Sequence, residues 1–508
     1  MSDILYEGGS NIGTFGDNAA PGAPAGYTGG SPVDTGDLRR KYNFGDRVSE
    51  LSIASDPFFR FVSKVAKKPT DDPQFKFTER RDSWHKRYAY VITGGATYAT
   101  ITSTAIAASV AGSPIQLRFG CDYASNGNKT NIVGKTVDYI PGGAGTTPTF
   151  FLEDQIIKVP VADTNGGSVA DYLIVKVGLV GTTGNTTDIA GTVIKGVPNG
   201  GSYLMGLPAS LDGAGTDVGA SEESLAPYKA YVVGSVFEKG TGYPETWKDQ
   251  PFSTSYGQTQ IWKTSMAMTN TDRATILKYE GNEWARIWKE KLVEHKWDIE
   301  QSLLFGSQNE TYRTTQGAVD WILNNGNAFT LDVTKKSQDH FLDDLSALLD
   351  PRYNNSMATV FFCSTAVYNW LHKLSGYFAN NLGMVNPASG NTSPDPSSAN
   401  SLGRADLAVT GRKKVLGLDT TTITTVYGDM NVVRNIHLDG TNIAMLGINM
   451  KNCAYRPLVG NGINRDTSVY VGVQTLENSG VDRRVDQIIT EAGMEWSMPE
   501  SHAVWKNA

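Results

Sequence analysis

Acidic residues recur at helical spacing near the centre of the chain, and paired carboxylates are the groups that perform general acid–base chemistry. Glu290, Glu294 and Asp298 follow one another at intervals of four, so a helix would stack them on one side. On that helix Arg286 would pair with Glu290, and Lys296 with Glu300. A mixed solvated face or a subunit interface therefore explains these charges better than a carboxylate active site.

Tryptophans and histidines give two further candidates for chemistry. Trp262, Trp284, Trp288 and Trp297 could stack on sugar rings, which would suggest a polysaccharide-acting enzyme. Trp284 and Trp288 are four residues apart, a spacing more typical of core or interface anchors. The histidines are scattered without metal-ligand spacing, and His295 is interpreted as a buried, hydrogen-bonded imidazole.

Familiar catalytic motifs are absent from the sequence. It contains no GxxxxGK[ST] phosphate loop, HExxH, GxSxG or EF-hand loop. We therefore expect no catalytic residue, no cofactor and no metal, although a triad assembled from distant residues remains an alternative. Cys121, Cys363 and Cys453 are far apart and form no CxxC pair, so we interpret them as buried, reduced thiols.

These residues require a long helix to position them. A single helix is predicted over residues 272–305, with Thr271 and Asp272 as N-cap types and Gly306 at its end. Its length would be roughly 50 Å. One face of this helix is predicted from apolar and small residues at steps of three, four or seven: Leu277, Gly281, Trp284, Trp288, Leu292, His295, Ile299 and Leu303.

The region before the helix divides into segments of different composition. Residues 1–50 are rich in Gly, Pro and Ala and are predicted to form an extended arm that lies on a neighbouring subunit. Residues 51–68 form an amphipathic segment, and residues 74–92 a long strand with a basic outer edge. The anchor residues expected in the amphipathic segment are Phe58, Phe59, Phe61, Val62 and Val65.

Residues 93–235 contain few charges, and short strand patterns alternate there with Gly-rich turns. This pattern predicts an inserted all-β module, either a sandwich or a small barrel. The expected strands are residues 98–104, 115–119, 149–159, 172–179 and 193–197. Strands over 231–237 and 258–268 then lead back to the long helix.

The region after the helix mixes both periodicities, so the fold class is α+β. Helices are predicted over residues 338–350 and 364–374, the second with Ser364 as its N-cap. A buried strand is predicted over 358–363, and a long loop over 381–404. Further strands are expected within 414–449, and then at 468–475 and 485–490.

Charge and hydropathy exclude several classes of protein. The formal net charge is −7 and charged residues make up 19% of the chain, so tight sequence-specific DNA binding is not expected. No run of about 18 apolar residues is present, so no transmembrane span is predicted. The first residues lack a basic and an apolar region, so we expect no signal peptide. The protein would then be made and kept in a cytoplasm, or leave it by a route that needs no leader.

The order of these parts resembles the major capsid protein of tailed bacteriophages, with its HK-ninety-seven-type fold. Local words resemble the SU-ten-like major head protein family: SDPFFRFVSKVAKK, QTQIWKTSMAMTNTDR, GNEWARIWKEKLVEHKWDIEQSLLFG, LDTTTITTVYGDMNVVRN and YRPL. The resemblance covers the chain outside residues 93–235. It implies these parts: an N-terminal arm (1–60), extended-loop strands (61–92 and 236–270), an inserted β-rich domain (93–235), a peripheral domain with a spine helix (271–350), an axial domain (351–450) and returning peripheral strands (451–508).

The resemblance implies a structural protein, not an enzyme, that self-assembles into hexamers and pentamers of an icosahedral shell. The shell would enclose double-stranded DNA without sequence specificity, in a virion assembled in the host bacterial cytoplasm. Expected partners are other copies of the chain, a portal protein, a separate scaffolding protein and a candidate cement protein, with no membrane. The assembly contacts are assigned to Trp84, Arg87, Trp262, Trp284, Arg286, Trp288, Glu290 and Glu294.

One alternative is a β-rich phage tail or adhesin protein whose insertion binds a receptor or a glycan. Trimers or hexameric rings would distinguish it from a shell subunit. The other alternative, a polysaccharide-acting enzyme, would lose turnover when single acidic residues are changed.

Overall fold

Strand β12 (Thr359–Cys363) lies at the centre of the larger apolar core, and all five of its side chains are buried. Successive side chains of a strand point to opposite faces. Phe361 and Cys363 accordingly pack into one hydrophobic cluster, and Val360 and Phe362 into another. Such burial on both faces requires covering elements on each side of the sheet. The computed structural model describes residues 56–81, 87–91, 111–121, 150–162, 169–183, 186–196, 203–204, 229–244, 252–277, 282–349, 351, 354, 359–380 and 407–507.

The sheet that contains β12 has seven strands in the order β11-β22-β16-β12-β15-β14-β13. The pairs β11–β22 and β12–β15 are parallel, and the others are antiparallel. Its remaining strands are β11 (Asn327–Leu331), β13 (Ala408–Val415), β14 (Leu418–Thr425), β15 (Gly428–Arg434), β16 (Ile443–Asn449) and β22 (Ala503–Asn507).

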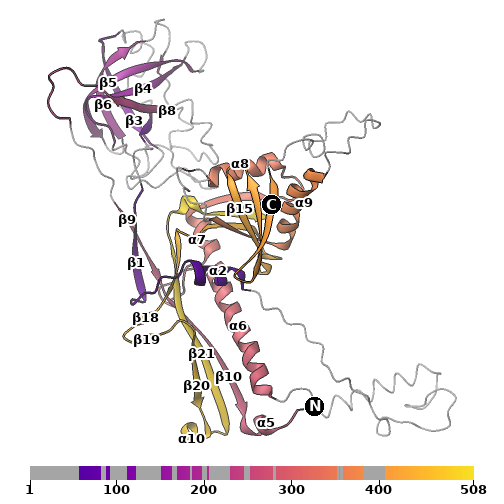
Figure 1. Cartoon of the computed structure of the whole chain (residues 1–508). Coiled ribbons are helices and arrows are strands. Elements are labelled where there is room, and N and C mark those ends of the chain that lie inside the picture. The colour runs from indigo at the N-terminus through magenta and orange to yellow at the C-terminus, as the bar shows by residue number, and fades with distance from the viewer. Residues whose placement is uncertain are drawn as a thin grey trace, which may run out of the picture. The chain divides into compact units, whose positions relative to one another are not determined.

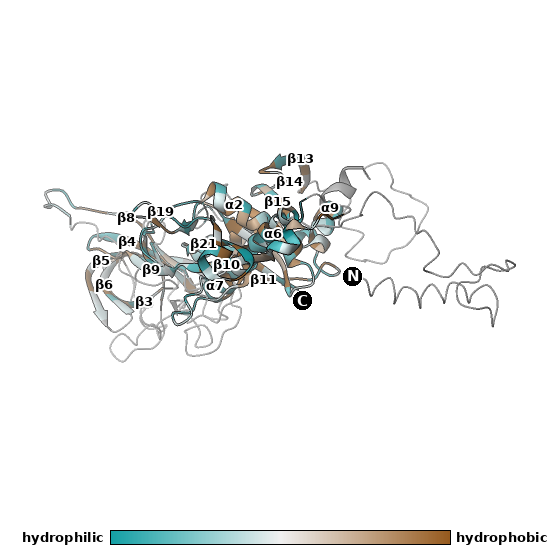
Figure 2. Ribbon diagram, turned by 90° about the horizontal axis from the view of Figure 1, so that it is seen from below, coloured by the Kyte–Doolittle hydropathy of each residue, from teal (hydrophilic) through white to brown (hydrophobic). Residues whose placement is uncertain are grey.

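Helices supply apolar side chains to both clusters of this sheet. One cluster receives residues of α8 (Gln338–Leu348) and α9 (Thr365–Asn380). The other receives residues of α2 (Pro57–Val65), α6 (Glu283–Phe305) and α7 (Ala318–Asn325). In Figure 2 hydrophobic residues are concentrated around α2, α6, β10 and β21, in agreement with this second cluster.

A second, antiparallel sheet runs alongside α6 (Figure 1). Its long strand β21 pairs with β10 on one side, and with β17 and then β20 on the other. The bounds are β10 (Gln260–Thr269), β17 (Cys453–Pro457), β20 (Ser468–Gln474) and β21 (Arg483–Trp496). Short elements complete this part: α5 (Asn270–Ala274), β18 (Val459–Gly460), β19 (Ile463–Asn464), α10 (Leu476–Ser479), and the 3-10 turns η4 (Ile436–Leu438) and η5 (Pro499–Ser501).

A third sheet is built from the strands between residues 88 and 235, and its pairings are all antiparallel. The order is β5-β6-β3-β2-β8-β4-β7, and an additional β4–β5 pairing closes six of the strands into a barrel. The barrel has its own buried cluster of Val, Ile, Leu and Phe side chains. The bounds are β2 (Tyr88–Val91), β3 (Pro114–Gly120), β4 (Gln155–Ala162), β5 (Val169–Thr183), β6 (Thr186–Lys195), β7 (Tyr203–Leu204) and β8 (Lys229–Ser235).

The predicted uninterrupted helix over 272–305 is wrong. The chain forms the short α5 and later the 23-residue α6, with the described residues 275–277 outside any helix. A new cap starts α6, because the Asn282 side-chain oxygen accepts a hydrogen bond from the Ala285 N–H at 3.2 Å. At 1.5 Å per residue α6 is about 35 Å long. The predicted end at Gly306 is confirmed; an added Cβ there would come 2.4 Å from the Ser302 carbonyl oxygen.

The predicted single strand over 74–92 is also wrong. Strand β1 (Gln74–Glu79) pairs with β9 (Ser253–Gln258), whereas β2 belongs to the barrel. Arg80, Arg81 and Arg87 lie outside both strands, and Arg81 is buried instead of forming a basic outer edge. The physical reason is the ion pairing of Arg81 described below.

The amphipathic segment is largely as predicted. Helix α2 buries Phe58, Phe59, Phe61 and Val62, but Val65 is 59% exposed and is not an anchor. The helix ends at Val65, so this side chain lies on the last turn, beyond the buried face. The expected strand over 98–104, the loop over 381–404 and the arm up to residue 55 lie outside the described residues. None of the described helices is long and apolar enough to span a bilayer.

Candidate functional site

Helix α6 is hydrogen-bonded to the β10–β21 sheet through two polar side chains of its C-terminal half, His295 and Ser302. The Trp262 indole N–H on β10 donates to the Ser302 hydroxyl at 3.0 Å. The His295 ring bonds Thr264 of β10 through Nδ1 at 2.9 Å, and Thr490 of β21 through Nε2 at 2.8 Å. His295 is completely buried, as predicted, and both of its nitrogens have partners. The helix and the sheet are therefore held at a fixed register.

Burial lowers the pKa of His295 from 6.5 to about 4, because a charged imidazolium would lose its hydration. Between those two values the folded chain binds fewer protons than the unfolded chain. The free energy of unfolding is therefore expected to fall as the pH drops from about 6.5 to 4, by up to about 3 kcal/mol from this group.

A His295→Gln variant should show a shallower loss of stability in acid urea titrations. An unchanged slope would contradict this; His502, whose pKa burial also lowers to about 4, remains in both proteins.

The N-terminal half of α6 is less buried. Trp284, Arg286 and Trp288 are half-buried, and Glu290 and Glu294 are exposed. The predicted Arg286–Glu290 ion pair is confirmed, and Glu294 pairs with Lys291 at 2.5 Å. These ion pairs are at the surface, where each contributes little to stability. Because Trp284 and Trp288 are only half-buried, the described part of the chain leaves some of their apolar area uncovered.

Glu300 on α6 caps the N-terminus of α2. Its two oxygens accept the backbone N–H groups of Phe58 at 3.1 Å and Phe59 at 2.6 Å. These first-turn donors have no partner within a helix, and the N-cap residue Asp56 makes no side-chain cap bond to them. The Asn435 amide donates to the same carboxylate at 2.9 Å. The predicted Lys296–Glu300 pair is therefore wrong, because Glu300 points into the core and is completely buried.

Burial raises the pKa of Glu300 from 4.5 to about 7. The nearby Asp56 also raises this pKa, whereas the three hydrogen-bond donors lower it because they favour the ionised form. Glu300 therefore joins α2, α6 and the turn at Asn435 through one carboxyl group that changes charge near neutral pH.

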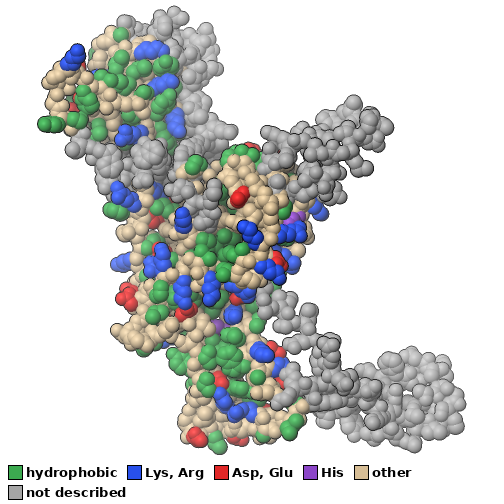
Figure 3. Space-filling view, viewed as in Figure 1, with side chains coloured by type: hydrophobic (Ala, Val, Ile, Leu, Met, Phe, Trp, Pro, Cys, Tyr) green, Lys and Arg blue, Asp and Glu red, His purple; other side chains and the backbone are tan. Residues whose placement is uncertain are grey.

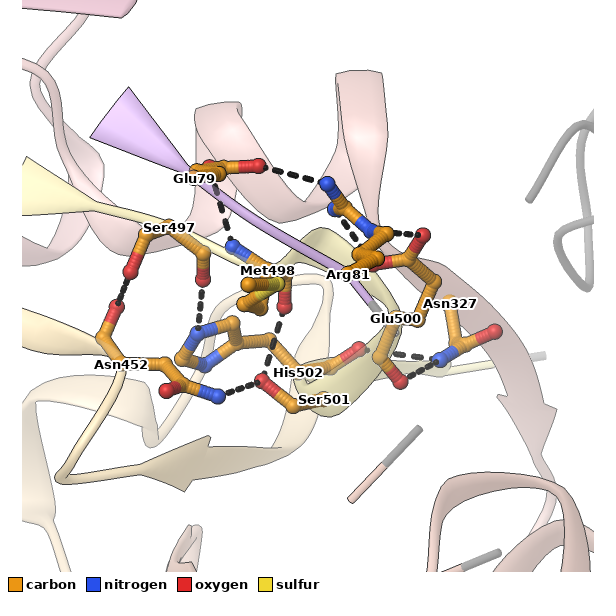
Figure 4. A network of polar contacts seen from close by, with 9 residues as sticks. All are labelled: Glu79, Arg81, Asn327, Asn452, Ser497, Met498, Glu500, Ser501 and His502. Carbon is orange, nitrogen blue, oxygen red and sulfur yellow. Dashed lines mark hydrogen bonds and ion pairs between the residues drawn. The ribbon is translucent and has the colours of Figure 1, made fainter. Parts of the chain in front are cut away.

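Arg81 forms a second buried polar centre, shown in Figure 4. Its guanidinium donates two hydrogen bonds to Glu500, at 3.1 and 2.9 Å, and a third to Glu79 at 2.9 Å. Glu79 also accepts the Met498 N–H at 3.1 Å, and Asn327 donates to the Glu500 carbonyl at 2.9 Å. Glu79 is the last residue of β1, so this network ties the base of the β1–β9 ladder to the C-terminal segment.

The rest of this network links the same segment to the turn after β16. His502 bonds the Ser497 carbonyl at 3.1 Å, and the Asn452 amide donates to the Ser501 hydroxyl at 2.8 Å (Figure 4). The Ser501 hydroxyl also donates to the Met498 carbonyl at 2.7 Å. These hydrogen bonds hold the segments together.

The other three residues that were assigned to assembly contacts are not part of α6. Trp84 lies outside the described residues. Arg87 is half-buried beside β2, where its carbonyl accepts the Val232 N–H at 3.0 Å. Trp262 is only 6% exposed and packs within this chain, so it positions β10 on α6 and is not open to another subunit.

Sequence reasoning missed Arg81, Glu300 and Glu500 as structural centres. Arg81 stood in a run of basic residues that suggested an exposed edge, and Glu300 had a helical neighbour of opposite charge. Glu500 is 419 residues from Arg81, and Phe58 and Phe59 are more than 240 residues from Glu300 in the sequence. No local signal could have paired them.

Metal-binding clusters and cysteine thiols are the remaining candidates for chemistry. In the part of the chain that the structure describes, no three His, Cys, Asp or Glu residues gather where they could hold a metal ion. Cys121, Cys363 and Cys453 are buried and form no disulfide, as predicted. Burial raises the pKa of Cys453 to about 12, so this thiol stays protonated at neutral pH.

Comparison with known proteins identifies the family. A family model described as SU10 major capsid protein matches residues 176–508, which is more than half of the chain. The chain therefore belongs to the SU10 major capsid protein family. It is accordingly a structural protein of the virion, and self-assembly follows from a capsid role.

Solved structures and curated proteins were also compared. A structure titled Gordonia phage Cozz is 11% identical with a TM-score of 0.34, covering 54% of this chain and 78% of that chain. Microbacterium phage Oxtober96 is 13% identical with a TM-score of 0.35, covering 54% and 81% respectively. The capsid of Myoviridae phage XM1 is 10% identical with a TM-score of 0.33, also covering 54% and 81%. Among curated proteins the search finds no match.

Proposed function

We propose that this major capsid protein forms the hexamers and pentamers of an icosahedral phage head that encloses double-stranded DNA. The observation that carries the proposal is the family match over residues 176–508. That range contains α6, both sheets beside it and the last strands of the barrel. The arrangement proposed for the subunit is the HK-ninety-seven-type fold, with α6 as the spine helix.

The division into domains is proposed on the strand pairings. Antiparallel β1 and β9 join residues 61–92 to residues 236–270 as an extended loop. The chain enters the barrel through β2 and leaves it through β8, and these two strands are neighbours, as expected for an inserted domain. In the seven-stranded sheet that contains β12, five strands come from residues 351–450, the proposed axial domain. The arm (1–60) and the peripheral parts (271–350 and 451–508) complete the proposal.

The proposed subunit contacts lie at the less buried end of α6. Trp284 and Trp288 would supply apolar anchors, and Arg286, Glu290 and Glu294 a charged rim around them. Trp84 and Arg87 would contribute from the extended loop. Large obligate interfaces, typically above about 2,000 Å², need apolar area of this kind.

Further partners are proposed from the capsid role and the charge. The net charge of −7 suits a shell that confines DNA mechanically without binding a sequence. A portal protein, a separate scaffolding protein and a candidate cement protein would complete the head. Assembly would take place in the host bacterial cytoplasm, and no chemical reaction is assigned to the chain.

The test of this function is assembly itself. The full chain, coexpressed with its scaffolding protein, is expected to form closed particles of uniform diameter in negative-stain electron microscopy. Monodisperse monomers, trimers or single rings under the same conditions would contradict the proposal.

Changing Trp284 and Trp288 together to Ala is expected to reduce assembly much more than it reduces folding. Interface tryptophans typically contribute about 2 kcal/mol or more each when truncated. The yield of closed particles, measured by sedimentation, should therefore fall by at least about tenfold. Tyr312→Ala is the matched control, since Tyr312 is 81% exposed and lies outside the proposed contact. Equal yields from both variants would remove Trp284 and Trp288 from the interface.

A further inference from the structure

Five exposed basic side chains on two adjacent parts of the chain form a surface, here named the basic strip. Its members are Lys64 in the last turn of α2, Lys68 just after that helix, and three consecutive residues of β13, Arg412, Lys413 and Lys414. Figure 3 shows Lys and Arg side chains gathered over the part of the molecule that Figure 1 labels α2 and β15.

Helix α2 and strand β13 lie next to each other. The Arg60 guanidinium of α2 donates to the Leu416 carbonyl, in the turn after β13, at 3.4 Å. Val415 of β13 packs against the hydrophobic cluster that α2 also enters, and alternation places Lys413 on the same side as Val415. Lys64 is four residues after Arg60, so it lies one turn further along the same side of α2. The two parts of the strip therefore form one surface.

The charges of the strip are not neutralised within the described part of the chain. None of its five side chains forms an ion pair there. The neighbouring Arg60 and Lys67 differ, because each pairs with an aspartate. Asp419 of β14 stands opposite Lys414 in the strand register, and the two form no ion pair in the described structure. The strip is therefore a local excess of positive charge on a chain whose formal net charge is −7.

Protection of a sheet edge explains only part of this surface. Strand β13 is the last strand of its sheet, and charged side chains on such a strand discourage pairing with other strands. A register shift between Val409 and Gly411 already disrupts this edge. Lys64 lies on a helix, so edge protection gives no reason for its position.

The density of positive charge on β13 matches a DNA backbone. Residues 412–414 place three cations within about 7 Å along the strand. Duplex DNA carries one negative charge per about 1.7 Å of its axis, and therefore about four charges over that distance. The duplex is also stiff over such lengths, so it loses little conformational entropy when it contacts a protein.

The chain's own acidic segments have a lower charge density. Residues 1–38 and 205–228 contain carboxylates and no Lys, Arg or His. The closest carboxylates of the first segment are three residues apart, and the four of the second segment are spread over residues 212–223. Because an extended peptide rises about 3.3 Å per residue, either segment would bring about two carboxylates to the three cations of β13. A peptide of this composition would also lose conformational entropy on binding.

We propose that the basic strip binds the phosphate backbone of the packaged double-stranded DNA, without reading its sequence. This inference rests on the proposed shell function, and it assigns the strip to the inner surface of the shell. Lysine and arginine side chains release counterions from the phosphates that they contact, so the interaction weakens as the salt concentration rises.

Acetylation of lysines in filled and emptied heads tests the proposal. Heads that contain DNA, and the same heads after release and nuclease digestion of the DNA, are treated briefly with an amine-acetylating reagent. Mass spectrometry then measures the modification of each lysine. Lys64, Lys413 and Lys414 are expected to react about fivefold more slowly in filled heads. Lys335, whose side chain is 86% exposed, is the control and should react at nearly the same rate in both.

The other outcomes contradict the proposal in different ways. Slow reaction of the strip lysines in both kinds of head would mean that protein covers them, either another copy or an acidic segment of the chain. Fast reaction in both would mean that the strip does not contact DNA. Protection of Lys335 as strong as that of the strip would mean general shielding. Each of these results would overturn the inference, whereas failure to form heads would instead contradict the proposed function.

The salt dependence of DNA binding supplies a second measurement. The unassembled full chain is titrated onto a fluorescent DNA duplex of random sequence at a series of low salt concentrations. Each neutralised phosphate adds about 0.9 to the slope of log K against log salt concentration, so changing Lys64, Lys413 and Lys414 to Gln should reduce the slope by about 2–3. The matched control removes the same charge from exposed positions outside the strip by changing Lys239, Lys263 and Lys335 to Gln. Equal slopes for the two variants, or no binding by the natural chain, would overturn the proposal.

Discussion

Changing Arg81 to Ala is expected to lower the free energy of unfolding of the isolated subunit by about 3–5 kcal/mol. Arg81 is only 9% exposed, and it neutralises two carboxylates that are equally inaccessible, Glu79 and Glu500. Burial disfavours its charged form, but Glu500 and Glu79 raise the pKa of Arg81 enough to keep it protonated. Without the guanidinium, both carboxylates would be buried without their cation. Urea denaturation followed by tryptophan fluorescence measures the effect.

Two controls isolate the cause of that loss. Arg80→Ala removes an exposed neighbour whose guanidinium lies 5.8 Å from the Phe252 ring, and it should cost no more than about 0.5 kcal/mol. The triple variant Glu79→Gln, Arg81→Met, Glu500→Gln removes all three charges and should recover much of the stability. A triple variant as unstable as Arg81→Ala would show that unpaired charge is not the cause.

Changing Glu300 to Ala is expected to cost about 3 kcal/mol or more, and to loosen α2 selectively. The substitution leaves three buried donors without an acceptor, namely the N–H groups of Phe58 and Phe59 and the Asn435 amide. Each unsatisfied buried donor costs about 1–3 kcal/mol. Hydrogen exchange should accelerate in α2 before it does in α8. Equal protection of α2 in both proteins would contradict the capping role.

Glu300→Gln separates ionisation from hydrogen bonding. The folded-state pKa of Glu300, about 7, lies above its unfolded value of 4.5, so the folded chain binds more protons between those two pH values. The stability of the natural chain that depends on this proton is complete below pH 4.5. It is lost as the pH rises through 7, by up to about 3 kcal/mol. The deficit of Glu300→Gln relative to the natural chain should therefore shrink between pH 5 and pH 8.

A matched comparison is available on the same helix. Glu294 is exposed and forms a surface ion pair with Lys291, so the stability difference between Glu294→Gln and the natural chain should be small, within about 0.5 kcal/mol. A deficit of Glu300→Gln that stays constant from pH 5 to pH 8 would mean that Glu300 does not titrate near neutrality.

Local patterns predicted the parts of the fold that local interactions determine. The alternation in residues 115–119 predicted β3, and the periodicity of residues 338–350 predicted α8. Ser364 was predicted as the N-cap of α9, and its hydroxyl accepts the Val367 N–H at 3.5 Å. His295 was predicted to be buried from its place in the apolar stripe, and the members of that stripe in the C-terminal half of α6, His295, Ile299 and Leu303, are buried.

The errors have a local cause at the break in the predicted helix and a long-range cause at two buried charges. The periodicity of residues 272–305 continues through 275–277, yet β-branched Thr275 and Ile276 are poor helix formers and Asn282 starts a new helix. Arg81 and Glu300 resembled solvated charges because Glu500 lies 419 residues from Arg81, and Phe59 lies 241 residues from Glu300. A single sequence contains no periodic signal for such pairs.

A cryo-electron microscopy reconstruction of particles formed by the full chain tests the proposed shell role most directly. We expect an icosahedral shell of pentamers and hexamers in which Trp284 and Trp288 of one copy contact another copy. A particle without that symmetry, or a shell in which both tryptophans face solvent, would contradict it.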